Sequence, residues 1–367
     1  MSLSAQPDWA DILAAQWIDA IRYAYKNKGF DGEIYHPIVK ATGEQLSGAV
    51  GAGYGVLQDV DFDSPDLVMR EYLKRNIWKF SVAKNYNDCI RLSNLLVKED
   101  GSLRSWNEFK REAERVVGDS NRYLKTEYDT IVASAQMSRL WQEIQRDKHI
   151  FPYVQLDVIL DKRTSDICEP LAGLIFEVDD PVLAYYFPPN HFNCRTTVRK
   201  LRTGTPSKNY ELPDIPEEFK NNSGISGQIF TDKNRYIENT PDDILAEAEV
   251  NYLKDLRNRV MKKAEQKYIG NTFEMGSGRK VSVSRKGIKH FLNQSHDNII
   301  EKNLIGMDLE TVLKTSKYIK SAPDIKGRGN FAYHYYKVDG RKDMFIVIRE
   351  VLATKEMQFY SVVQRIR

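Results

Sequence analysis

The chain has 367 residues, of which 41% are hydrophobic, so it can bury the cores of two or three domains without cross-links. Its three cysteines are an odd number and are widely spaced, which argues against a secreted disulfide framework and favours a reducing compartment. The net charge is +3, but residues 271–367 hold 18 Lys and Arg against 10 Asp and Glu, so this basic segment either suits an anionic partner such as nucleic acid or forms a solvated lysine-rich surface.

Residues 1–150 are predicted to form a helical region. Apolar residues recur at steps of three and four between residues 9 and 25, which is the stripe of an amphipathic helix. Residues 47–55, SGAVGAGYG, lack the Lys-Ser/Thr that a phosphate-binding loop requires, so a hinge or a close helix crossing is the better interpretation. Helix formers dominate residues 66–147, with a helix-helix turn at residues 99–102. We see neither a signal peptide nor an apolar run of about twenty residues, and therefore expect no membrane partner.

The middle of the chain changes its pattern twice. Short runs typical of β-strands follow, so residues 151–202 are predicted to form a small α+β unit that contains cysteine and histidine. Residues 203–240 hold prolines and glycines among Asn, Ser and Asp, which is the composition of a linker or a loosely wrapped arm. Residues 241–269 are predicted to form a connecting helix, because acidic residues come first and lysines last, as the helix dipole favours.

The last segment, residues 270–367, is predicted to be a separate domain. Residues 284–296 and 307–319 show helical patterns, and three strand-like runs follow them, FAYHYYKV, DMFIVIREV and MQFYSVVQRI. Asp339-Gly340 lies between the first two runs and predicts a hairpin turn, because glycine tolerates positive φ. Helices followed by an antiparallel meander form an α+β domain, so the fold class expected for the whole chain is multidomain α+β.

The first group with the potential for chemistry consists of Cys168, His191 and Cys194. Thiolate and imidazole are good zinc ligands, and the spacing His191-x-x-Cys194 lets one turn present two of them. The fourth ligand would be Asp161 or Asp166, and the chain has no C-x-x-C pair to complete the site. No cofactor is certain, and zinc is the candidate. Two alternatives stay open: buried cysteines beside a hydrogen-bonded histidine, or a catalytic cysteine activated by histidine.

The second group lies in the basic segment and has the residue types of metal-independent RNA cleavage. Such cleavage needs a base for the 2′-hydroxyl proton, an acid for the leaving oxygen and cations for the charge on phosphate. His290 is the first candidate for acid or base, and its alternative is a surface histidine without a partner. The candidate catalytic residues are His290, Lys337, Arg349, Ser361 and His334, and the candidate nucleic-acid-binding residues are Arg285, Lys286, Lys289, Arg328 and Tyr360.

Strand alternation limits this second group. On an unbroken strand His334 and Lys337 face opposite sides, so only one of them can join a site, and Lys337 is favoured. The alternation that keeps Ile346 and Ile348 in the core places Arg349 on the other face, where it can meet a phosphate.

The motifs in residues 161–200 resemble a known family. Their order is Asp161, Thr164 and Cys168, then Leu171 and Gly173, then Asp180-Pro181, and finally PPNHFNCRTT at residues 188–197. With the helical segment that precedes it, this order resembles the phage head morphogenesis family, the Mu F-like minor head proteins, over about residues 1–205. The resemblance implies a protein of the virion, in the capsid interior, and of the bacterial host cytoplasm, with the portal and capsid or scaffold proteins as partners. Ser165 and Thr196 stand where members often have cysteines, which weakens the case for a metal.

The C-terminal segment is similar to a second family. The order of KHFLNQSH, YYKVDGRKDMFIVIREV and FYSVV resembles the phage-borne nucleases of the barnase, EndoU, colicin and RelE superfamily, the BECR fold. This resemblance implies an RNA-binding, toxin-like ribonuclease domain. The chain is thus expected to be a phage minor head protein that carries a metal-independent ribonuclease-like effector. The alternative is a purely structural virion protein whose basic domain binds packaged DNA or scaffold without catalysis.

Overall fold

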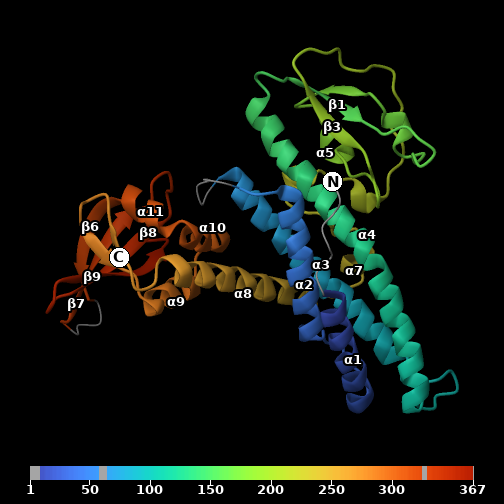
Figure 1. Ribbon diagram of the computed structural model, residues 1–367, viewed down its shortest axis with the longest axis horizontal. Coiled ribbons are helices and arrows are strands. Elements are labelled where there is room, and N and C mark those ends of the chain that lie inside the picture. Colours follow the sequence, from blue (N-terminus) through green and yellow to red (C-terminus); the bar gives the residue numbers. More distant parts are fainter. Residues whose placement is uncertain (1–8, 58–63, 325–328, 367) are drawn as a thin grey trace. The chain divides into compact units, whose positions relative to one another are not determined.

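The structure, a computed structural model, describes residues 9–57, 64–324 and 329–366 (Figure 1). The chain divides into two compact units, and the main boundary lies after Tyr252, within helix α8 (Asp242–Lys267). Helices dominate the first part of the chain and a sheet dominates the last, so the α+β prediction is confirmed. Among the helices in the described ranges, none is long and apolar enough to cross a membrane.

The first unit begins with long helices that bury apolar stripes. Leu13, Trp17 and Ile21 of the first helix are buried, as their spacing predicted. Gly53 shows why the glycine-rich stretch is a close helix crossing, because a Cβ there would lie 2.3 Å from the carbonyl oxygen of Val132 on the fourth helix. The helices are α1 (Trp9–Asn27), α2 (His36–Tyr54), α3 (Pro65–Asn94) and α4 (Trp106–Asp147).

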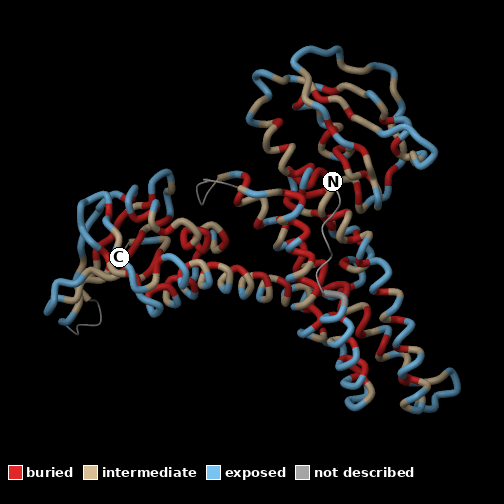
Figure 2. The backbone as a smooth tube through the Cα atoms, in the orientation of Figure 1, coloured by how far each residue is buried: buried red, intermediate tan, exposed pale blue. Residues whose placement is uncertain are grey.

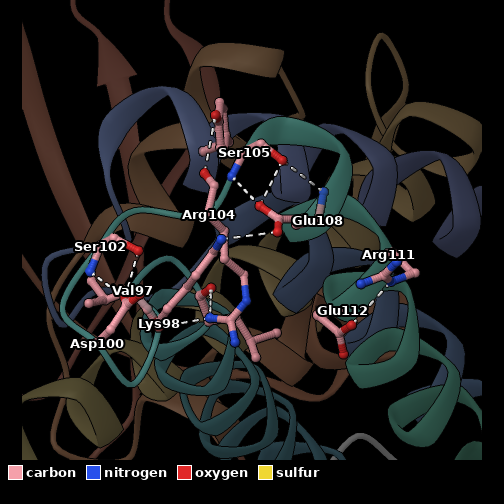
Figure 3. Close-up of polar contacts among 11 residues, drawn as sticks. Val97, Lys98, Asp100, Ser102, Arg104, Ser105, Glu108, Arg111 and Glu112 are labelled. Atoms are coloured by element: carbon pink, nitrogen blue, oxygen red, sulfur yellow. Dashed lines mark hydrogen bonds and ion pairs between the residues drawn. The ribbon is translucent and has the colours of Figure 1, made fainter.

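The turn between α3 and α4 fixes the start of α4 (Figure 3). Ser105 accepts a hydrogen bond from the backbone N–H of Glu108, whose carboxylate accepts one from the backbone N–H of Ser105 at 2.9 Å. This reciprocal arrangement is a capping box, and it satisfies two N–H groups that the helix itself leaves free. The backbone bond from Ser105, together with Lys98, lowers the pKa of Glu108 to about 2. The predicted helix-helix turn is therefore confirmed, and the capping box marks the point where the turn ends and α4 begins.

A buried ionic group joins α3 to α4. Lys84 Nζ lies 2.6 Å and 2.7 Å from the two carboxylate oxygens of Glu127, and both side chains are about 95% buried. The second buried carboxylate, Asp88, accepts a hydrogen bond of 2.7 Å from Ser120 Oγ. Burial raises the pKa of Asp88, against the opposing effects of Lys84 and Ser120. Lys84 therefore pairs directly with Glu127 and acts on Asp88 through its charge, while Asp88 itself lies 3.5 Å from Arg91.

The small α+β unit predicted after residue 151 packs on the end of α4. Its sheet has the order β2-β1-β3 and is antiparallel, with Val154 opposite both Phe176 and Lys200. Trp141 and Ile144 of α4 join its core. The elements are β1 (Tyr153–Asp157), η1 (Glu169–Leu171), β2 (Ile175–Glu177), α5 (Leu183–Tyr186) and β3 (Thr197–Leu201).

Residues 203–240 pack against the helices of the first unit. The ring of Phe230 stacks on that of Phe80 at a centroid distance of 3.8 Å, and Ile229 and Ile237 are buried in the same core. The side chain of Asn76 on α3 accepts hydrogen bonds from the backbone N–H groups of Ile229 and Phe230. The segment was predicted to be a linker or loose arm, but its few apolar residues bind it to the unit. It holds η2 (Glu217–Phe219), α6 (Ser223–Ser226) and α7 (Arg235–Glu238).

The second unit is a six-stranded sheet with short helices. The strand order is β4-β5-β9-β8-β7-β6, and β7 pairs with β8 without interruption, with Tyr333 opposite Arg349. At the hairpin between them Gly340 has a φ of +70°, which an Asp-Gly turn permits. The elements after α8 are β4 (Thr272–Glu274), β5 (Lys280–Ser282), α9 (Arg285–Asn293), α10 (Ile299–Leu304), η3 (Ile305–Met307), α11 (Leu309–Thr315), β6 (Lys317–Pro323), β7 (Phe331–Lys337), β8 (Phe345–Val351) and β9 (Glu356–Val363).

One predicted boundary is wrong. A helix was predicted through residues 307–319, whereas α11 ends at Thr315 and β6 begins at Lys317. β6 lies at the sheet edge and is exposed along nearly its whole length (Figure 2), so it lacks the apolar alternation that marks a half-buried strand.

Candidate functional site

Cys168, His191 and Cys194 come together in the first unit. Their ligand atoms all lie within 4.8 Å of one another. Cys168 Sγ is 3.1 Å from His191 Nε2 and 3.7 Å from Cys194 Sγ. Cys168 ends the turn before η1, and the other two belong to the loop that follows the cis Pro188-Pro189 bond. The residues that the spacing predicted as ligands are thus neighbours in space.

The pKa values of the three side chains are shifted in different directions. A hydrogen bond from the thiol of Cys194, with a smaller effect of His191, lowers the pKa of Cys168 to about 4. The same bond raises the pKa of Cys194, and Cys168 raises the pKa of His191. The pair of cysteines therefore holds one thiolate, and it lies next to the imidazole.

The two predicted fourth ligands do not join this group. Asp161 accepts bonds of 2.8 Å and 2.6 Å from both terminal nitrogens of Arg195, which lowers its pKa. Asp166 is exposed and is not in the group of donor atoms. Ser165 Oγ lies 2.9 Å from His191 Nε2. Within the described residues the group has three donors of the kind zinc prefers.

A second candidate site is a cavity of about 1160 Å³ in the second unit. It lies between α9, the strands β7, β8 and β9, and the residues that follow β9. Its polar lining carries both charges, with Lys286, Arg349 and Arg365 against Asp297 and Asp324. The cavity is large enough for a nucleotide-sized ligand.

His290 and Arg349 meet over one aromatic ring in this cavity. The imidazole stacks on the ring of Tyr360 at a centroid distance of 4.1 Å, and the Arg349 guanidinium carbon lies 5.3 Å from the same ring centre. Arg349 also lies 4.7 Å from the centre of the Phe331 ring. Within the described residues, His290 Nδ1 and Arg349 Nε are buried without a hydrogen-bond partner. Two residues that line the cavity therefore each hold a buried nitrogen without a hydrogen-bond partner among the described residues.

The environment keeps His290 neutral. Burial lowers its pKa below the usual range, and the charge of Arg349 acts in the same direction, against a weaker effect of the Tyr360 backbone. A neutral imidazole near neutral pH can accept a proton.

Some of the predicted residues of this second group line the cavity, and others lie outside it. His290, Arg349, Ser361, Lys286 and Tyr360 all line the cavity. The others that are described do not: His334, Lys337, Arg285 and Lys289. Arg328 lies outside the described residues.

Each residue that stays outside the cavity has its own surroundings. His334 lies on the other face of β7, where its Nε2 is 2.9 Å from Glu350 Oε2. Lys337 ends β7, with its Nζ 5.7 Å from the centre of the Phe345 ring. Arg285 forms an ion pair of 2.5 Å with Glu265, and Lys289 is exposed. Lys337, which the sequence favoured, and His334 therefore both lie outside the cavity lining.

Two kinds of residue were missed. Phe331, Tyr333 and Tyr335 line the cavity. Their spacing of two in FAYHYYKV is the sequence signal that places them on one face of a strand. The other is Lys302, which is 0% exposed and donates to the carbonyls of Phe291 and Gln294 at 2.6 Å and 2.8 Å. It binds the end of α9, the helix that presents His290. A lysine in a polar run gives no sequence signal for that role.

Lys302→Met is expected to loosen α9, because the new side chain fills the space but leaves the helix-end carbonyls without a donor. We expect a local destabilisation of about 3 kcal/mol. Hydrogen exchange of the α9 amides in the full chain measures it, with the exposed Lys289→Met on the same helix as control. Equal exchange in both variants would show that Lys302 does not hold the helix.

Comparisons with known proteins find matching families for two parts of the chain. Residues 101–199 match the family described as Phage Mu protein F like protein, and residues 251–357 match the one described as Large polyvalent protein-associated domain 3. The chain is 30% identical over 82 residues to "Putative capsid assembly protein F" of Escherichia phage Mu, a match that covers 22% of this chain and 19% of the relative. No solved structure matches the chain.

These matches support one resemblance and leave the other as a prediction. The Mu F-like match includes α4, β1, β2, the start of β3 and the Cys168, His191 and Cys194 group, so the resemblance is confirmed for this segment. The match over residues 251–357 carries no nuclease description and ends before Tyr360 and Ser361. The nuclease resemblance of the second unit therefore stays a prediction.

Proposed function

We propose that the chain is a phage head protein whose first unit takes part in capsid assembly, in contact with the portal and with capsid or scaffold proteins. The observation that carries this proposal is the Mu F-like match of residues 101–199, together with the similarity to a protein named for capsid assembly. The segment lies within one compact unit, so it can act as a folded module. Its places would be the bacterial cytoplasm during assembly and the capsid interior afterwards.

Co-assembly tests this first proposal. The full chain is produced together with the portal, scaffold and major capsid proteins of its phage, and procapsids are purified by sedimentation. We expect the chain to sediment with procapsids and to be absent from that fraction when the portal is left out. A chain that stays at the top of the gradient while normal procapsids form would contradict the assembly role.

We further propose that the Cys168, His191 and Cys194 group binds zinc. The imidazole Nδ1 lies 2.7 Å from the carbonyl oxygen of Phe192, so it carries the proton there and turns the Nε2 lone pair to the cysteines. Two thiolates held tetrahedrally at about 2.3 Å from one zinc ion lie about 3.8 Å apart, and the two sulfur atoms here are 3.7 Å apart. When bound, zinc would tie the turn before η1 to the loop before β3.

For the second unit we propose RNA binding and cleavage in the cavity of His290. The supporting observation is a half-buried imidazole, whose pKa lies below its usual range, and a guanidinium over one aromatic ring, each with a nitrogen left without a partner among the described residues. His290 would accept the proton of a 2′-hydroxyl as its oxygen attacks phosphorus, and Arg349 would stabilise the charge that develops on phosphate. The bond from phosphorus to the 5′-oxygen breaks, and the leaving oxygen takes a proton from the Lys286 ammonium. Ser361 would hydrogen-bond a phosphate oxygen.

Binding of packaged DNA or scaffold without catalysis is the competing function of this unit. Contacts with phosphate release counterions, so DNA binding of this kind would weaken steeply as salt rises. The full chain is mixed with labelled RNA and with labelled DNA in EDTA, and binding and chain length are followed together. Cleavage of RNA alone supports the ribonuclease; salt-sensitive binding of intact DNA and RNA supports the structural role.

A further inference from the structure

The zinc group described above has fewer protein donors than zinc requires. Structural zinc sites have four protein ligands, whereas sites with three keep one position for an exchangeable ligand. Among the described residues the donor group holds two sulfurs and one imidazole nitrogen, and Asp161 is occupied by both terminal nitrogens of Arg195. One coordination position of the ion would thus remain open.

That position has a cavity beside it. His191 and Cys194 line a space of about 220 Å³. A water molecule takes about 30 Å³ of the liquid, so this space can hold several waters or a small anion. Cys168, by contrast, is only 4% exposed, so the open side of the group is that of His191 and Cys194. The exchangeable ligand would enter there.

The cavity favours an anionic ligand. Arg163 and Arg195 both line it, but the terminal nitrogens of Arg195 are bound to Asp161. Arg163 is therefore the guanidinium that can bind a ligand, and a guanidinium matches carboxylate oxygens in geometry as well as charge. The carboxylate that lines the cavity, Asp129, forms an ion pair of 2.5 Å with Lys125. Zinc with two thiolates and a neutral imidazole carries no net charge, so it does not itself repel an anion.

From this arrangement, and resting on the proposed zinc binding, we infer that the zinc ion takes a carboxylate as its fourth ligand, and that Arg163 helps to hold it. The carboxylate is supplied from outside the group, either by an Asp or Glu side chain of a head protein or by a free carboxylate. Ligand exchange at the metal would then respond to assembly.

Cobalt substitution tests this inference in the full chain. Cobalt(II) gives a thiolate-to-metal absorption that reports the cysteine ligands, and visible bands that report the remaining ligand. Sodium acetate is titrated in chloride-free buffer, with sodium sulfate at equal ionic strength as the reference. We expect the visible bands to change and saturate with acetate while the thiolate absorption stays.

A matched pair of arginine variants sharpens the test. Arg163→Gln should weaken acetate binding by roughly tenfold without changing cobalt binding, since one charge-assisted contact is lost. Arg199→Gln removes an exposed arginine of β3 that pairs with Asp157 outside the cavity, and should leave acetate binding unchanged. An equal loss in both variants would contradict the role given to Arg163.

The outcomes separate the zinc proposal from this inference. A chain without thiolate-to-cobalt absorption overturns both. Absorption that is present, with visible bands unaffected by acetate, overturns the inference and leaves zinc binding in place. If procapsid-bound protein shows the acetate-type spectrum before acetate is added, the carboxylate belongs to a partner; if only added acetate produces it, the ligand is a free carboxylate.

Discussion

Lys84→Met is expected to destabilise the first unit by about 3–5 kcal/mol, because it leaves the buried carboxylate of Glu127 without its counter-charge. Lys84 is 4% exposed and Glu127, its bidentate partner, is also 4% exposed. Methionine has nearly the length of lysine, so the loss comes from charge and hydrogen bonding, with little change in packing. Because α3 and α4 meet at this group, the loss affects both helices. Hydrogen exchange of α3 and α4 amides in the full chain measures it.

Asp88→Asn is the control that separates charge from packing. The amide keeps an oxygen that can accept from Ser120 Oγ, and it removes a carboxyl group that pairs with Arg91 and is influenced by the charge of Lys84. We expect a change of less than about 1 kcal/mol. Equal exchange in Asp88→Asn and Lys84→Met would show that the lysine is not the element that holds this group.

The same group predicts a pH effect. Burial raises the pKa of Asp88 in the folded state above its unfolded value, so the folded state binds more protons between those two values. The contribution of Asp88 to stability is therefore complete below the unfolded pKa and is lost as pH rises through the folded pKa. Asp88→Asn should flatten this fall, which urea titrations at several pH values measure.

His290→Ala is expected to reduce RNA cleavage by about 10²–10⁴-fold, the usual contribution of a general base. The imidazole is the group in the cavity whose pKa is lowered by burial, so it is unprotonated near neutral pH. Cleavage by the wild type should therefore rise with pH, level off at a pKa below the usual histidine range, and fall as the imidazole is protonated in acid. Initial rates on a short RNA, measured across pH, give both the size of the loss and the profile.

Three positions outside the cavity serve as controls for His290. Lys289→Ala, on the exposed side of the same helix, and Lys337→Ala, at the end of β7, should both keep most of the activity. His334→Ala removes the partner of Glu350 on the opposite sheet face and should act only through stability. Loss of cleavage in His334→Ala with activity retained in His290→Ala would place the chemistry on the wrong face for this account.

Local pattern predicted much of the fold. The helical stripe of α1 follows from spacing alone, since it reflects a single buried face, and the alternation in β8 places Val347 and Arg349 together along the cavity. β6 could not be predicted this way, because an exposed edge strand has no apolar alternation. Residues 203–240 have the composition of a linker, and only the structure reveals that Phe230 stacks on Phe80.

In the candidate sites too, some features could be predicted from the sequence and others could not. Cys168, His191 and Cys194 lie close in sequence, and a resemblance marked them, so their meeting could be predicted. The partnership of Lys84 with Glu127 spans 43 residues, and the bonds of Lys302 depend on where α9 ends. Charged residues that become buried look like surface residues in a sequence, because burial depends on the tertiary fold.

Cleavage at His290 can be tested through the chemistry of the RNA ends that the full chain forms in EDTA. We expect fragments with a 2′,3′-cyclic phosphate and a 5′-hydroxyl, formed by the wild type and lost in His290→Ala. Intact RNA with a chain that is folded by hydrogen exchange would contradict the ribonuclease assignment. Fragments with a 5′-phosphate, or cleavage that requires added metal, would contradict the mechanism built on His290 and Arg349.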